Sequence, residues 1–356
     1  MKKEDELILF MSRLTDWEKN KDQVADLLRD KLDWGYIILN CRCNKVSNIF
    51  FHHLCVSGFY GNLKKQVFKI YLENYKFTEF KLEILRKNFY CICEKLNKLN
   101  VQYAIIKGFA LSDLIYFEHG NNLRDFNDID ILVKESDLQH VCSTLQQLGY
   151  IQGEYDTVSE NVNPASREEV IRMKMTSHQI VPFCKVVTNG FKAKIPIEVD
   201  INFTIFEGGK ILPLISTDKI LEKTIEVKDE MGNMYQTLNP YFMFIQIVYH
   251  FYKEYNYEFM QEEYNDLTLQ KLCDIREFIL KYFPVINQNN LAEIINMYKL
   301  NDAIYYVLNL LKNFYDDLEL NDFLYTIKNE TSTKENETKL SRSKIIQSAF
   351  HSDFNL

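Results

Sequence analysis

The chain has 356 residues, of which 46% are hydrophobic and 26% charged, as expected for a globular protein with a sizeable core. Its formal net charge of −8 argues against broad electrostatic capture of nucleic acid or of an anionic membrane. The N-terminal sequence MKKEDELILFMSRL has no signal-peptide pattern, and no apolar run reaches the roughly eighteen residues that a membrane span needs. We therefore expect a cytoplasmic protein.

Soft ligands gather early in the chain and raise the question of zinc. They are Cys41, Cys43, His52, His53 and Cys55. The spacing fits none of the usual zinc motifs, because a single residue separates the first two thiols. We favour buried structural roles for these residues, and zinc is the alternative.

Periodicity divides the sequence into four regions. Residues 1–97 follow a helical repeat almost throughout, and residues 239–328 return to it. Residues 98–238 mix strands and helices, and residues 329–356 are polar and predict a flexible tail. The predicted fold class is α+β, with a small mixed β-sheet core between two helical regions.

Elements of the mixed region follow from local signals. We predict strands at 101–106, 128–133, 172–187 and 191–206, and a hairpin at 225–238. Ser136 is the expected N-cap of a helix at 137–148, and Asn189-Gly190 predicts a tight turn between the third and fourth strands. Asn239-Pro240 predicts the start of the next helix.

Two pairs of acidic residues lie inside apolar strands. Asp128 and Asp130 alternate with aliphatic residues in DIDILV, and Glu198 and Asp200 do the same in IPIEVDI. Because side chains alternate between the faces of a strand, each pair projects from one face. Burying such carboxylates is costly unless they are paired or hold a cation, so the pattern predicts a site for one or two Mg²⁺ or Mn²⁺ ions.

A glycine turn precedes the first acidic strand. In AIIKGFALSDL, Gly108 ends a strand and begins a helix, an arrangement that presents backbone N–H groups to a phosphate. Lys107 and Ser112 lie nearby in sequence, and Arg124 precedes the acidic strand. We expect these four residues to contact the phosphates of a nucleotide.

The glycine turn IKGFAL and the strand RDFNDIDILV together resemble the nucleotidyltransferase superfamily with a polymerase-beta-like core. More narrowly, the chain is similar to a family of uncharacterised bacterial nucleotidyltransferases with a Leu-Lys-Gly-x-Ala-Leu turn. Two departures stand out. Phe109 occupies the position where the superfamily often has serine, and Asp200 replaces the histidine of the narrower family's third strand.

The resemblance extends to the flanking segments. His178 in SHQIVPF matches a histidine before the third strand and implies a contact with the nucleotide. His250 in YHFYKE and Asp274 in LQKLCDIREF match positions on the C-terminal helices, which we interpret as a buried hydrogen-bonded pair. Glu198 matches the acidic residue of the third strand and is therefore favoured over Asp200 as the third metal ligand.

The resemblance implies a metal-dependent enzyme that moves a nucleoside monophosphate from a nucleoside triphosphate to a hydroxyl group and releases pyrophosphate. Asp128 and Asp130 would hold both metal ions, and Glu198 or Asp200 would help to bind one of them and orient or deprotonate the acceptor hydroxyl. The acidic composition favours a small-molecule, peptide or protein acceptor over nucleic acid. The alternative is a non-catalytic nucleotide-binding or antitoxin-like partner protein with the same fold.

Overall fold

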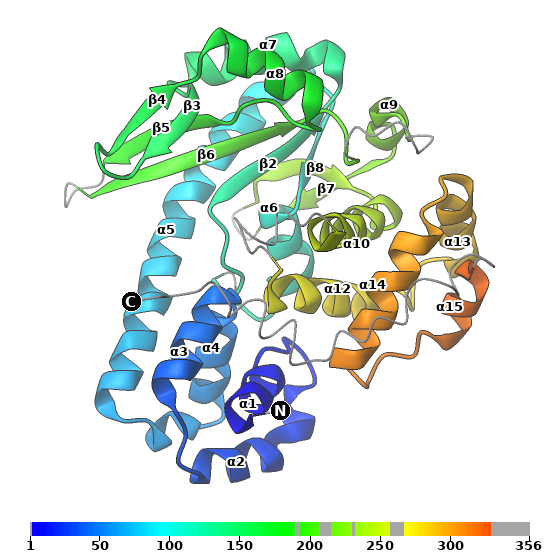
Figure 1. Ribbon diagram of the computed structural model, residues 1–356. Coiled ribbons are helices and arrows are strands. Elements are labelled where there is room, and N and C mark those ends of the chain that lie inside the picture. The colour runs from blue at the N-terminus through cyan, green and yellow to red at the C-terminus, as the bar shows by residue number, and fades with distance from the viewer. Residues whose placement is uncertain are drawn as a thin grey trace. The chain divides into compact units, whose positions relative to one another are not determined.

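A computed structural model describes residues 2–120, 122–188, 193–206, 215–229, 232–256 and 267–328 (Figure 1). The predicted turn at Asn189-Gly190 and the polar tail lie outside these residues. The chain forms two compact units, each built from segments that are distant in the sequence. Unit 1 comprises Met1–Thr78, Ile115–Asp125 and Phe244–Leu356, and unit 2 comprises Glu79–Leu114 and Phe126–Met243. Each of the four predicted regions is continuous in the sequence, whereas each compact unit combines segments that are separated in the sequence.

Unit 2 contains one mixed sheet of eight strands, which confirms the predicted α+β class. The spatial order is β4-β3-β5-β6-β2-β1-β8-β7. The strands are β1 (Tyr103–Ile106), β2 (Asp128–Val133), β3 (Ile151–Asp156), β4 (Asn161–Pro164), β5 (Phe183–Thr188), β6 (Lys194–Asn202), β7 (Thr224–Lys228) and β8 (Met234–Leu238). β2 pairs in parallel with β6 and antiparallel with β1, so β2 lies inside the sheet.

The helices of unit 2 include parts of two helices that also belong to unit 1. They are α6 (Gly108–Leu111), α7 (Leu138–Gln147), α8 (Arg167–Thr176), α9 (Thr217–Leu221), the C-terminal part of α5 (Lys65–Lys98) and the first residues of α10 (Pro240–Asn256). The aliphatic side chains of β2 explain its place in the sheet: Ile129, Ile131 and Val133 are all buried. Their burial supplies the free energy that holds the acidic strand in a central position.

Two local predictions in unit 2 are wrong. Residues 167–176 form α8 and not the start of a strand, because the Ser166 side chain caps the helix by accepting a hydrogen bond from the Glu169 backbone N–H. Only the second part of the predicted third strand, β5, is extended. Ser136 lies in a 3₁₀ turn, Glu135–Asp137, and α7 begins one residue later than predicted, with Asp137 at its N-cap.

Unit 1 is helical, as the periodicity of both terminal regions predicts. Its helices are α1 (Lys3–Met11), α2 (Lys21–Arg29), α3 (Trp34–Cys43), α4 (Ser47–Val56), the first part of α5, α10 from Phe244 onward, α12 (Leu269–Tyr282), α13 (Gln288–Met297), α14 (Asn301–Phe314) and α15 (Asn321–Ile327). Asn239 caps α10, as predicted: its side-chain oxygen accepts hydrogen bonds from the N–H groups of Tyr241 and Phe242.

Candidate active site

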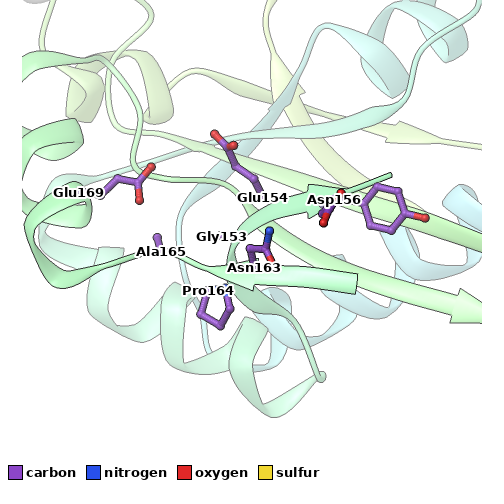
Figure 2. A pocket seen from close by; sticks show the side chains of 8 residues that line it. Gly153, Glu154, Asp156, Asn163, Pro164, Ala165 and Glu169 are labelled. Carbon is purple, nitrogen blue, oxygen red and sulfur yellow. The ribbon is translucent and has the colours of Figure 1, made fainter. Parts of the chain in front are cut away.

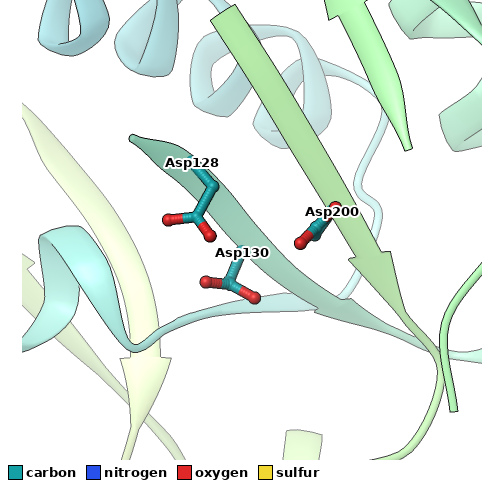
Figure 3. Close-up of side chains that lie close together, drawn as sticks. All are labelled: Asp128, Asp130 and Asp200. Carbon is teal, nitrogen blue, oxygen red and sulfur yellow. The ribbon is translucent and has the colours of Figure 1, made fainter. Parts of the chain in front are cut away.

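The parallel pairing of β2 with β6 brings the predicted carboxylates together. In the register of the two strands, Asp128 lies opposite Glu198 and Asp130 lies opposite Asp200. Three of these four side chains, Asp128, Asp130 and Asp200, offer carboxylate oxygens that all lie within 4.8 Å of one another. Figure 3 shows the three groups, two from β2 and one from β6. The structure thus groups Asp200, and not the favoured Glu198, with the pair on β2.

Burial and mutual repulsion shape the electrostatics of this carboxylate triad, Asp128, Asp130 and Asp200. Asp130 is only 1% exposed. Burial raises the pKa of Asp130, and the charge of Asp128 raises it further, although Lys107 opposes both effects. Burial and then the charges of Asp130 and Asp128 raise the pKa of Asp200 well above its usual value. Without a cation, the triad is an unfavourable concentration of negative charge.

Lys107 supplies one positive charge to the triad. Its Nζ donates a hydrogen bond to Asp130 Oδ1 at 2.7 Å. Burial alone would lower the pKa of Lys107, but the charges of Asp130 and Asp128 outweigh it and raise the pKa above its usual value. The residue has a φ of 51°, in the left-handed region that lysine rarely adopts, so the backbone at the glycine turn is strained.

Asn202 is a polar residue of this site that the sequence analysis missed. It is buried, and its Nδ2 lies 3.5 Å from the same Asp130 Oδ1 and 3.4 Å from the Asp200 carbonyl oxygen. The signal was available in the sequence, since residues 198, 200 and 202 share one face of a strand. A buried amide two residues beyond an acidic residue continues the polar row.

The oxygens of the triad fit a hard divalent cation. Asp130 Oδ2 and Asp200 Oδ1 are buried and accept no hydrogen bond from any residue that the structure describes. Buried carboxylate oxygens without donors are rare, because each loses its hydration without replacement. Mg²⁺ and Mn²⁺ prefer oxygen ligands of this kind, so the donor set suits either ion.

Glu198 lies beside the triad but outside the group of mutually close oxygens. It is half-buried on the same face of β6, and burial followed by the charges of Asp128 and Glu154 raises its pKa. Its partner in the register is Asp128, at the end of β2. Glu198 lies two residues before Asp200 on β6 and therefore adds negative charge next to the triad.

Packing explains two residues of the glycine turn, Gly108 and Phe109. A Cβ on Gly108 would lie 2.8 Å from the ring of Phe126, so only glycine fits. Phe109 stacks on Phe89 of α5 at 4.3 Å between ring centroids and meets Phe126 edge to face at 4.9 Å. The departure from serine at this position therefore anchors the turn in an aromatic cluster.

Ser112 lies inside the protein. It follows α6 directly, is fully buried, and its Oγ has no hydrogen-bond partner among the described residues. The structure places its hydroxyl inside the protein and not at the surface of the turn. This differs from the predicted phosphate contact, because the helix that follows Gly108 turns the side chain inward.

Arg124 belongs to unit 1, where it binds a carboxylate of the protein. Its Nε and Nη2 donate to Asp274 of α12, with the shortest distance 2.9 Å, and Asp274 also accepts a hydrogen bond from the Tyr116 hydroxyl at 2.7 Å. The guanidinium group of Arg124, which was predicted to hold phosphate, thus binds Asp274. The predicted pairing of His250 with Asp274 is wrong, since the His250 ring lies 3.1 Å from Glu254.

His178 lies in unit 2 next to the end of β6. Its backbone carbonyl accepts a hydrogen bond from the Phe203 N–H at 3.0 Å, and its ring Nδ1 lies 3.4 Å from the Ser177 hydroxyl. The side chain is half-buried. The neighbouring Gln179 forms a bridge to Asn202, so the segment is held against the strand that carries Asp200.

The early cysteines and histidines do not come together as a group of potential metal ligands in the described residues. Within the described parts of the chain, the carboxylate triad is the one group of three or more potential ligands close enough to share an ion. Cys41 is buried and Cys43 is exposed, while His53 stacks on Trp17 and accepts or donates a hydrogen bond at the Arg13 carbonyl. Buried structural roles, as favoured above, account for Cys41 and His53.

A separate pocket of about 260 Å³ lies at the hairpin of β3 and β4 (Figure 2). It is acidic, with Glu154, Asp156 and Glu169 in its lining, and it contains none of the predicted site residues. Gly153 is essential to its shape, because a Cβ there would lie 2.0 Å from the Asn163 carbonyl oxygen.

A mixed sheet with three clustered carboxylates on two adjacent strands is the arrangement expected of a nucleotidyltransferase core. The chain belongs to the family of uncharacterised nucleotidyltransferases, whose model matches residues 30–316. A crystal structure of an antigenic nucleotidyltransferase-like protein from Paracoccidioides brasiliensis is 13% identical, with 70% of this chain and 97% of that chain covered and a TM-score of 0.35. No curated protein matches the sequence. None of the described helices is long and apolar enough to cross a membrane.

Proposed function

We propose that this protein transfers a nucleoside monophosphate from a nucleoside triphosphate to an acceptor hydroxyl, with Mg²⁺ or Mn²⁺ held by the carboxylate triad. The proposal rests on one observation, the clustering of Asp128, Asp130 and Asp200 within 4.8 Å in a chain of the nucleotidyltransferase family. It places the protein in the polymerase-beta-like superfamily, as the sequence motifs imply.

In the proposed reaction, the acceptor oxygen forms a bond to the α-phosphorus while the bond from that phosphorus to the bridging oxygen of the β-phosphate breaks. The acceptor hydroxyl loses its proton, and pyrophosphate leaves with the electron pair of the broken bond. A bound divalent cation supplies charge neutralisation for the phosphate oxygens. Most of the catalytic effect is then positioning and electrostatic stabilisation.

The environment of each carboxylate indicates its role in the proposed reaction. Asp128 and Asp130 would hold the cation, since both project from β2 toward the same point. Asp200 would complete the cation site and, with its raised pKa, would also orient the acceptor hydroxyl or accept its proton. Glu198 precedes Asp200 by two residues on β6, and the segment of His178 is held next to the end of β6, so we propose that these two residues contact the substrates.

The acceptor is proposed to be a small molecule, a peptide or a protein side chain. Negative charge dominates around the triad, where Glu198 and Glu154 add to it. A polyanionic acceptor such as nucleic acid would be repelled from such a surface, whereas a neutral or cationic acceptor would not.

The test uses nucleoside triphosphates labelled at the α-phosphate, with Mg²⁺ or Mn²⁺ and a panel of hydroxyl-bearing acceptors that includes the protein itself. We expect label transfer together with pyrophosphate release. Asp128→Asn/Asp130→Asn should abolish both signals, and Glu168→Gln, at an exposed carboxylate of α8, should leave both unchanged. Nucleotide binding without label transfer to any acceptor would favour the non-catalytic alternative. Equal signals from the wild type and the double variant would refute the assignment of the site.

A further inference from the structure

The ammonium group of Lys107 already occupies a cation position within the carboxylate triad. It lies 2.7 Å from Asp130 Oδ1 and also interacts electrostatically with Asp128 and Asp200. Here it is directed at the most buried member of the triad, which is 1% exposed.

The position of Asp130 determines how many further cations the triad can hold. Asp130 is the shared neighbour of the other two members, since Asp128 precedes it by two residues on β2 and Asp200 lies opposite it on β6. Two divalent ions about 4 Å apart are held well by a carboxylate that lies between them with one oxygen toward each ion. Asp130 is placed to be that bridge.

Lys107 lies at one of the two oxygens of Asp130. Oδ1 accepts the hydrogen bond from Lys107 at 2.7 Å and lies 3.5 Å from Asn202 Nδ2. Oδ2 is buried and has no hydrogen-bond partner among the described residues, so it is the oxygen left for a cation. A second divalent ion that bridged to Oδ1 would lie next to the ammonium group of Lys107, and the repulsion between these like charges opposes its binding.

The charges around the triad favour the same count. Three ionised carboxylates and one ammonium group carry two negative units, which one divalent cation neutralises, and the half-buried Glu198 adds at most one more. A second divalent cation would give the triad and Lys107 a net positive charge in a mostly buried site, and such an uncompensated charge is unfavourable.

We propose that Lys107 is a built-in cation of this site, and that the nucleotide-free protein therefore binds one divalent cation, through Asp128, Asp130 Oδ2 and Asp200, and not two. The inference rests on the proposed function, because it concerns the same metal site. It gives Lys107 a different role from the phosphate contact that the sequence predicts. Lys107 acts through Asp130 and is therefore a positioning residue.

The experiment counts bound Mn²⁺ by electron paramagnetic resonance, since the signal of the free hydrated ion disappears on binding. We expect one Mn²⁺ per chain in the wild-type protein without nucleotide. Lys107→Met removes the charge at similar length and should admit a second ion, giving two per chain, whereas Lys107→Arg keeps the charge and should give one. Lys134→Met is the matched control, because Lys134 pairs with Asp218 at 3.1 Å outside the triad, and it should give one ion.

Two ions in the wild type, or a single ion of unchanged affinity in Lys107→Met, would overturn the inference. Circular dichroism checks that each variant is folded, and Lys107→Gln replaces Lys107→Met if the latter does not fold. No Mn²⁺ bound to the wild type would overturn the inference and the metal site of the proposed function together. Two ions would overturn only the role of Lys107, and label transfer from nucleotide would still be tested separately.

Discussion

The Asp274→Asn substitution removes one charge from a buried ion pair without changing the size of the side chain. In the wild-type protein, Arg124 donates to both oxygens of Asp274, and the Tyr116 hydroxyl donates to one of them. The side chains of Arg124 and Asp274 are only 7% and 3% exposed. The variant therefore leaves the guanidinium group buried next to a neutral amide.

The expected loss follows from this burial. Breaking a buried ion pair by removing one partner costs about 3–5 kcal/mol, because the remaining charge has lost its hydration and its counter-charge. Asparagine keeps one acceptor oxygen for Tyr116 or Arg124, so we expect about 3 kcal/mol. The pair Asp26 and Arg29 is the matched control: their side chains are 72% and 75% exposed, and Asp26→Asn should cost less than about 1 kcal/mol.

Urea unfolding followed by tryptophan fluorescence measures the effect. The chain has two tryptophans, Trp17 and Trp34, and both lie in unit 1 with the ion pair, so the signal reports on that unit. The double variant Arg124→Met/Asp274→Leu removes both charges and should be more stable than Asp274→Asn. The reasoning would be refuted if Asp274→Asn cost no more than Asp26→Asn, and a free phosphate-binding role for Arg124 would then regain support.

Three further predictions concern single side chains. In calorimetry, Asp200→Asn should weaken Mn²⁺ binding about 100-fold and Glu198→Gln less than tenfold. The reason is that Asp200, and not Glu198, has a carboxylate oxygen within 4.8 Å of the β2 pair. A larger loss in Glu198→Gln than in Asp200→Asn would make Glu198 the ligand. Burial raises the pKa of Asp200 above 3.8 and lowers the pKa of His53 from 6.5 to about 3. Without metal, unit 2 should therefore lose stability as the pH rises from 3.8 through the raised pKa, and unit 1 should lose it as the pH falls from 6.5 toward 3. Hydrogen exchange at β2 would follow unit 2, and tryptophan fluorescence would follow unit 1. The dependence of stability on pH should flatten in Asp200→Asn for unit 2 and in His53→Gln for unit 1. An unchanged dependence on pH in either variant would contradict the assignment of that residue. Gly153→Ala places a Cβ 2.0 Å from the Asn163 carbonyl oxygen and should cost about 3 kcal/mol in urea unfolding, whereas a neutral result would mean that the hairpin relaxes freely.

Local pattern was sufficient to predict the elements that carry the site. Alternation of aliphatic and acidic residues at 128–133 predicted β2, and the same alternation predicted β6, because the period of a strand is a property of the backbone. Gly108 predicted the turn into α6. Where local signals competed, pattern failed: residues 172–187 were predicted as one strand, although the cap at Ser166 begins a helix that runs to Thr176.

Local sequence was enough to show that Asp128 and Asp130 share one face of a strand and that Glu198 and Asp200 share a face of another, because both facts follow from residues close in sequence. That Asp200 completes the triad could not be predicted in this way, because strand register depends on pairing between residues about 70 positions apart and not on local pattern. Tertiary packing also assigned the charged partners. Lys107 and Arg124 each had several carboxylates available in the sequence, and the fold placed Asp130 and Asp274 within hydrogen-bond distance of them.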